Sequence, residues 1–111
     1  MSDTSSNPRC MSDPQEVVHI DRSFEPLIPR FMANRKKEIV TTRQALTEQD
    51  FETVRRVAHG MKGVGGSYGF DKVTELAAMI EQAAKSGDAT SITQQLHTLE
   101  GYLSNIQIAY D

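Results

Sequence analysis

One histidine and one lysine lie within an unusual concentration of glycine. Residues 58–70 read AHGMKGVGGSYGF and contain His59, Lys62 and five of the seven glycines of the chain. A neutral imidazole keeps a lone pair available near neutral pH, so it can attack phosphorus without a separate base. A lysine three residues further along a helix can neutralise phosphate oxygens. The pair therefore predicts a histidine that carries a phosphoryl group.

The element that holds this pair is predicted to be a helix beginning after Asp50. From Ser23 onward apolar residues recur every three or four positions, without sustained alternation or a hairpin turn, so no strand is predicted. His59 points away from the apolar stripe of its helix, and we expect solvent to reach its ring. The residues of that stripe are Phe51, Val54, Ala58 and Met61.

The glycines near His59 have two expected roles. Each glycine inside a helix lowers its stability by about 1 kcal/mol relative to alanine, so several together indicate a requirement. Gly63 and Gly66 follow His59 on the same outward face and leave a strip without side chains, along which another protein can approach the ring. Gly65 and Gly69 are assigned instead to helix packing and to the end of the helix.

Turn and capping residues divide the rest of the chain into further helices. Pro29 lacks an amide hydrogen and is predicted to open the first long helix after a short turn over residues 24–28. Arg35 and Thr42 interrupt the apolar stripe of that helix. Short connections between the helices predict an all-α fold, an antiparallel up-down four-helix bundle with a short extra N-terminal helical turn. The predicted N-caps of the later helices are Asp50, Asp71 and Asp88.

Composition limits the functional classes. The chain has 111 residues, enough for one domain, and 12 Lys and Arg against 15 Asp and Glu give a net charge of −3. A broad cationic surface for nucleic acid is therefore not expected. No stretch has the length of a membrane span, and the single Cys10 cannot form an internal disulfide, so we expect a cytoplasmic protein without membrane attachment. Residues 1–18 are polar and expected to be disordered, which leaves residues 19–111 as the domain.

The glycine-rich stretch resembles a known signature. Ala58-His59-Gly60-Met61-Lys62-Gly63, continued by Gly66-Ser67-Tyr68-Gly69-Phe70, is similar to the signature of histidine-containing phosphotransfer (HPt) domains. The resemblance extends over the helical pattern from about residue 20 to the C-terminus. One departure is Gly60, where many members of the family carry a bulkier residue.

The resemblance implies a role in a phosphorelay of two-component signal transduction. His59 would accept a phosphoryl group at Nε2 from an aspartate of a receiver domain and pass it to another receiver. Lys62 would stabilise the phosphate, and Gly63 and Gly66 would admit the receiver. Mg²⁺ is expected on the receiver, with no cofactor on this chain. Arg55 lies one turn before His59 on the outward face, and Ser67 belongs to the signature, so both are candidate docking residues.

The same reading predicts a phosphoryl carrier rather than an enzyme. A chain of this length has no room for an ATP-binding kinase domain, so we expect a free-standing monomeric relay module. Its partners would be response-regulator receivers, and a hybrid sensor histidine kinase can supply one of them. The cognate receivers, the direction of phosphate flow and the signal do not follow from the residues.

Two alternatives come from other classes. Gly60-Met61-Lys62-Gly63 also fits the GXXG loop of nucleic-acid-binding KH domains, although those domains need strands that are not predicted here. A helical adaptor that binds receivers without carrying phosphate is the second alternative. His19 and His97 are too far apart in the sequence from His59 to predict a metal site and are expected to be structural or solvated.

Overall fold

The computed structural model describes residues 16–111, and helices make up most of this part of the chain. Its elements follow one another in the order β2 (Val17–Ile20), the 3₁₀ helix η1 (Arg22–Leu27), α2 (Ile28–Thr47), α3 (Phe51–Tyr68), α4 (Asp71–Lys85), α5 (Ala89–Asn105) and β3 (Gln107–Tyr110).

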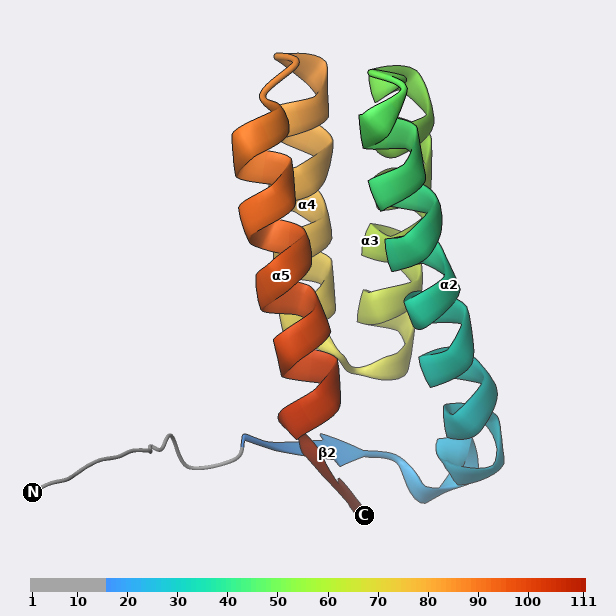
Figure 1. The fold of residues 1–111 in the computed structure, drawn as a ribbon. Coiled ribbons are helices and arrows are strands. Elements are labelled where there is room, and N and C mark those ends of the chain that lie inside the picture. Colours follow the sequence, from blue (N-terminus) through green and yellow to red (C-terminus); the bar gives the residue numbers. More distant parts are fainter. Residues whose placement is uncertain (1–15) are drawn as a thin grey trace, which may run out of the picture.

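The four long helices stand side by side along their length (Figure 1). The α2–α3 and α4–α5 connections lie at one end of the molecule, and the α3–α4 connection lies at the other end (Figure 1). Short connections of this kind make neighbours in the sequence neighbours in space. α3 packs most extensively on α4, and that contact brings together the side chains described in the next section.

The helix ends follow local signals. The carboxylates of Asp50 and Asp88 each accept a hydrogen bond from a backbone amide in the first turn of the following helix, as predicted. The Asp71 prediction is wrong, because Phe70 occupies the N-cap of α4 without a side-chain bond and Asp71 is the first helical residue. Its negative charge in the first turn still interacts favourably with the positive, N-terminal end of the helix dipole. α2 begins at Ile28, one residue before Pro29, and η1 provides the short turn before it.

Apolar side chains from every long helix form one core. Phe31 of α2 stacks on Phe70 with ring centroids 4.6 Å apart, and it also packs against Tyr68 at 4.9 Å. The largest fully enclosed apolar side chains are Phe70, Ile20, Met61, Ile80, Ile92, Leu96, Leu99, Val54 and Val73. Aromatic packing thus joins α2 to the α3–α4 connection.

Two polar residues that interrupt the apolar stripe of α2 are nevertheless buried. Thr42 is fully buried, and its hydroxyl donates a hydrogen bond to the Glu38 carbonyl one turn earlier, so burial leaves it with a partner. Arg35 lays its guanidinium over the Phe31 ring, 4.7 Å from the centroid, and forms an ion pair with Glu38. The Thr42 hydroxyl and the Nε–H group of Arg35 thus both find their partners within α2.

Two short strands correct the all-helix prediction. β2 and β3 pair in parallel, with Val17 opposite Gln107 and Ile20 opposite Tyr110. They lie at the end of the molecule where α5 ends (Figure 1). Runs of four residues are too short to show a clear alternation of apolar and polar residues. The two strands also lie at opposite ends of the domain sequence, so the local pattern could not reveal their pairing.

The strand also shifts the predicted domain boundary. Val17 and Val18, which the composition assigned to a disordered tail, belong to β2, and Val18 is buried. Residues 1–15 of that predicted tail lie outside the described residues. In residues 16–111 no helix is both long and apolar enough to cross a membrane.

Candidate functional site

His59 lies in the middle of α3 with its ring directed to solvent. The side chain is 67% exposed, as the helical periodicity predicted. The core residues of α3, Val54, Ala58, Met61 and Gly65, are all buried on the other side of the helix. An incoming group can therefore reach the imidazole without any rearrangement of the core.

The charged partner of His59 comes from the neighbouring helix. Nδ1 of His59 lies 2.9 Å from Oε2 of Glu81 in α4. The ammonium of Lys62 donates a hydrogen bond of 2.7 Å to the other oxygen, Oε1, of the same carboxylate. Glu81 is only 9% exposed, whereas Lys62 is 38% exposed. One carboxylate thus connects the two residues that the sequence predicted to act on phosphate.

The bond to Glu81 determines which ring nitrogen of His59 is available. A carboxylate only accepts hydrogen bonds, so Nδ1 must carry the proton that lies between them. In the neutral ring the lone pair then belongs to Nε2. No residue in the described part of the chain forms a hydrogen bond with Nε2. The solvent-facing nitrogen is therefore the nucleophilic one.

Glu81 remains a carboxylate because its neighbours are cationic or donate hydrogen bonds. The hydrogen bond from Lys62 is the largest influence and lowers the pKa of Glu81. Burial acts in the opposite direction, while the hydrogen bond from His59 lowers the pKa further. The two hydrogen bonds keep Glu81 ionised, and the ionised carboxylate in turn makes both hydrogen bonds stronger.

Thr74 fixes the contact between the two helices. Its hydroxyl donates a hydrogen bond of 2.8 Å to the backbone carbonyl of Lys62. A Cβ atom at Gly65 would lie 2.8 Å from the Thr74 oxygen and 3.0 Å from the Val73 side chain. Gly65 therefore permits the close approach of α3 and α4, as predicted, and this approach places Glu81 beside His59.

The remaining glycines of α3 differ in their surroundings. A Cβ atom at Gly60 or Gly63 would meet nothing within 4 Å, so no contact inside the chain requires glycine there. At Gly66 it would make only an ordinary contact of 3.5 Å with Thr74. Gly69 ends the helix with a positive φ of 89°, the role predicted for it. An open strip thus runs beside the exposed His59 ring.

A comparison with protein families gives this site a context. Residues 27–109 match the family model of the Hpt domain. The chain belongs to the Hpt domain family. Neither the curated proteins nor the solved structures contain a match to it. Hpt domains take part in histidine phosphotransfer in phosphorelays as phosphoryl carriers rather than kinases.

The KH alternative does not fit this Hpt domain. Gly60-Met61-Lys62-Gly63 lies inside α3, whereas a KH domain uses its GXXG sequence as a loop that clamps a nucleic-acid backbone. The amide groups of this stretch belong to the interior of a helix. They are therefore not free to bind phosphates along a strand of nucleic acid.

The other two predicted docking residues flank the site. Arg55 lies one turn before His59 and forms an ion pair with Glu52, which raises the pKa of Arg55. The Ser67 hydroxyl donates a hydrogen bond to the Gly63 carbonyl and remains exposed. Both are on the surface of α3, but each already has a partner within the Hpt domain.

The other two histidines of the described residues lie outside this cluster. His19 is exposed in β2, where its ring is 3.3 Å from the carboxylate of Asp111. His97 is exposed on α5. Within residues 16–111 no group of three or more His, Cys, Asp or Glu side chains is arranged to hold a metal ion.

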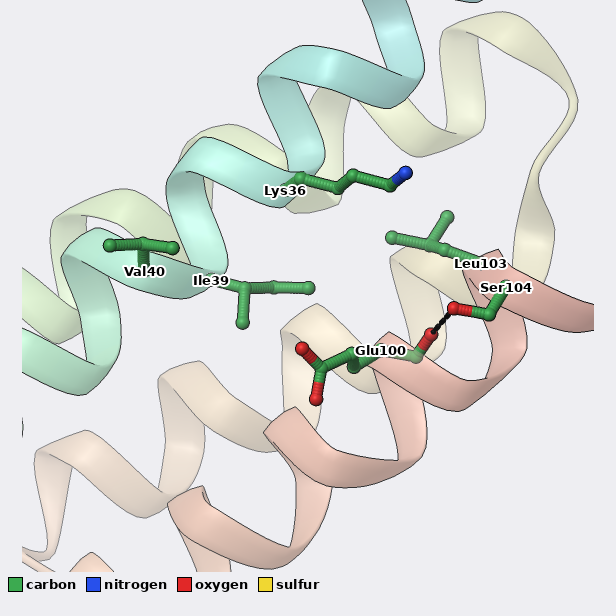
Figure 2. A pocket seen from close by; sticks show the side chains of 6 residues that line it. All are labelled: Lys36, Ile39, Val40, Glu100, Leu103 and Ser104. Carbon is green, nitrogen blue, oxygen red and sulfur yellow. Dashed lines mark hydrogen bonds between the residues drawn. The ribbon is translucent and has the colours of Figure 1, made fainter.

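A pocket of the Hpt domain lies between α2 and α5, not at His59 (Figure 2). Inside it the Ser104 hydroxyl donates to the Glu100 carbonyl, a bond within one helix. The candidate site on α3 and α4 shares no residue with its lining, which consists of Lys36, Ile39, Val40, Glu100, Leu103 and Ser104.

Sequence reasoning did not find Glu81. Glutamates are common on helices, and its position in the apolar pattern of α4 marks it only as a charged residue on the buried side. Glu81 follows His59 by 22 positions on a different helix. A glutamate on the apolar side of α4 was the one available signal, and Lys85, one turn later on the same helix, offered it an ordinary local partner.

Proposed function

We propose that this Hpt domain carries a phosphoryl group on Nε2 of His59. The group comes from an aspartyl phosphate of a response-regulator receiver domain and passes to the aspartate of another receiver. The observation that carries this proposal is the hydrogen bond between His59 Nδ1 and Glu81, because it leaves Nε2 exposed with a lone pair.

Lys62 supplies the positive charge for the transferred group. Phosphoryl transfer depends mainly on position and on the neutralisation of the phosphate oxygens. The Lys62 ammonium lies beside the same carboxylate as the imidazole and is partly exposed. It can therefore turn toward the phosphate as the group arrives. Mg²⁺ and an acidic pocket come from the receiver, and this chain contributes no cofactor.

The receiver approaches along the open strip beside His59. Gly63 and Gly66 lie on the outward face of α3, and a side chain at Gly63 has free space around it. Their lack of side chains allows the backbone and metal site of a receiver to come close to the ring. Arg55 and Ser67 border this approach and contact the partner.

The whole protein acts as a monomeric carrier between receivers, one of which can belong to a hybrid sensor kinase. The alternating connections in Figure 1 support an antiparallel up-down bundle as its architecture. The negative net charge disfavours nucleic acid as a partner. The single cysteine supports a cytoplasmic location.

Phosphoryl transfer from receivers tests the proposal. Wild-type protein and His59→Gln are incubated with a panel of phosphorylated receivers, and acid-labile phosphate on this chain is measured. Label on the wild type alone supports the carrier function. Label retained by His59→Gln excludes His59 as the site. Receivers that bind the wild type without labelling it support the adaptor alternative instead.

A further inference from the structure

Arg35 of α2 is almost completely buried, yet most of its hydrogen-bond donors have no partner. Its side chain is 5% exposed, and its guanidinium lies over the Phe31 ring. Its Nε–H group donates to the Glu38 carboxylate. Within residues 16–111 the two terminal nitrogens, Nη1 and Nη2, form no hydrogen bond. Buried N–H groups of a charged side chain are costly without an acceptor, so an acceptor that is not part of these residues is indicated.

A pocket opens beside this guanidinium, and we call it the Arg35 pocket. It has a volume of about 250 Å³ and lies between the first half of α2 and the last turns of α3. Its polar lining consists of Arg30, Asn34, Arg35 and Tyr68, and no acidic residue lines it. The lining is therefore rich in N–H and O–H donors.

The charges around the Arg35 pocket are not balanced. Glu38 neutralises Arg35, whereas Arg30 belongs to none of the ion pairs in the described part of the chain. Two arginines and one carboxylate leave a single positive charge without a partner. α2 begins at Ile28, so the pocket also lies near the positive end of the α2 dipole. A ligand with one negative charge therefore matches this lining.

We infer that the Arg35 pocket binds a carboxylate group. A planar carboxylate accepts two parallel hydrogen bonds from one edge of a guanidinium. Nη1 and Nη2 of Arg35 form the edge that the bond from Nε–H to Glu38 leaves unused. Arg30 supplies the positive charge that balances the ligand, and Asn34 and Tyr68 add hydrogen-bond donors.

Two sources can supply this carboxylate. Val64, which lines the Arg35 pocket, directly follows Gly63 of the open strip. A receiver that lies along the strip beside His59 therefore has the pocket next to it and can insert an Asp or Glu side chain. A small free carboxylate can enter as well, because Arg30 at the pocket is exposed to solvent. The first source rests on the proposed function, whereas the binding site itself does not.

Acetate is the probe for the site, and acetamide is its uncharged control. The full-length protein is titrated with each compound at constant ionic strength, and the guanidinium signals of Arg35 are followed by nuclear magnetic resonance. We expect a saturable shift with acetate and a much smaller one with acetamide, because a charged acceptor forms the stronger hydrogen bonds. The same response to both compounds would show that the pocket does not recognise charge and would overturn the inference.

Variants of the two arginines locate the bound acetate. Arg30→Gln removes the unpaired charge at an exposed position and should weaken acetate binding roughly tenfold, the effect of losing one contact with a charged group. Arg35→Lys keeps its charge but loses the paired donors, so it should weaken binding too. Arg30→Gln keeps the test valid if Arg35→Lys does not fold. Arg43→Gln removes the same charge from α2 outside the pocket and should bind acetate as the wild type does. Wild-type binding in Arg30→Gln and Arg35→Lys would overturn the inference.

Receiver binding distinguishes the two sources. The affinities of the wild type, Arg30→Gln and Arg43→Gln are measured for a receiver that labels His59. A roughly tenfold loss in Arg30→Gln alone identifies a receiver side chain as the ligand. Equal affinities together with saturable acetate binding identify a free carboxylate, and equal affinities without it would overturn the inference. If no receiver labels His59, the proposed function fails, and the acetate titration alone decides whether the Arg35 pocket is a carboxylate site.

Discussion

Glu81 connects two side chains that would otherwise act separately. At 9% exposure its carboxylate has given up much of its contact with water, and the hydrogen bonds from Lys62 and His59 replace that contact. Each partner keeps part of its surface free for an incoming phosphate. Glu81 therefore fixes the positions of His59 and Lys62, while both side chains remain accessible from solvent.

The lowered pKa of Glu81 predicts how stability changes with pH. A carboxyl group with a folded-state pKa below its ordinary value of 4.5 contributes stability above that value and loses the contribution as the pH falls through the folded-state pKa. Wild type should therefore lose more unfolding free energy than Glu81→Gln between about pH 5 and pH 3. Urea denaturation at a series of pH values measures this difference. Parallel curves for the two proteins would contradict it.

Lys62→Met should slow phosphoryl uptake by His59. Loss of one buried charge-stabilising donor typically reduces a rate by roughly a hundredfold or more, but Lys62 is partly exposed and water can replace part of its effect, so we expect about tenfold. The initial rate of transfer from one phosphorylated receiver measures the effect. Lys37→Met, an exposed lysine on α2, is the control and should react at the wild-type rate. Equal rates for Lys62→Met and Lys37→Met would show that Lys62 has no role in phosphoryl uptake.

At the scale of elements, the contact between α3 and α4 determines the site. Gly65 lies at this contact, and Gly63 lies two residues earlier on the open face of the same helix. Packing therefore requires glycine at Gly65, whereas no contact within the described part of the chain requires it at Gly63. Stability can distinguish the two roles.

Gly65→Ala and Gly63→Ala should change stability in opposite directions. At Gly65 the added methyl group would lie within 3.1 Å of three atoms of Val73 and Thr74, so we expect a loss of about 1–3 kcal/mol in the free energy of unfolding. At Gly63 it has free space, and the better helix propensity of alanine should add about 0.5–1 kcal/mol. Urea denaturation of both variants measures the two changes. A loss of stability in Gly63→Ala would show that this glycine has a structural role.

At the scale of the whole molecule, β2 and β3 join the two ends of the domain. Hydrogen bonds from the Asp111 amide to the Ile20 carbonyl and from the Arg22 amide to the Asp111 carbonyl continue the pairing beyond the strands. Ile20 is 1% exposed and belongs to the core, so the strand pair contributes apolar packing as well as hydrogen bonds. Neither strand contributes to the His59 site.

Ile20→Ala should therefore lower stability without changing the chemistry. Truncation of a buried isoleucine typically lowers the free energy of unfolding by about 2–5 kcal/mol. Val17→Ala, at a position 48% exposed in the same strand, should remain within about 0.5 kcal/mol of wild type. Thermal unfolding measures both, and phosphoryl uptake well below the unfolding temperature should be equal in all three proteins. Slower uptake by folded Ile20→Ala would indicate coupling between the strands and the site.

The sequence alone determined the features that depend on residues close together along one helix. Apolar spacing predicted the four helices and the exposure of His59, and side-chain chemistry predicted the caps at Asp50 and Asp88. The division of the glycines into packing, helix-ending and open positions followed from the same periodicity. These properties are local, because neighbouring residues and the helical repeat are sufficient to produce them.

Only the tertiary structure decided which residues from different elements meet. The Glu81 carboxylate reaches His59 because α3 and α4 approach closely at Gly65, and no spacing along the chain records that approach. The pairing of β2 with β3 likewise depends on where the helices leave the two ends of the domain. Such contacts are set by how whole elements pack, so the tautomer of His59 became visible only in the folded molecule.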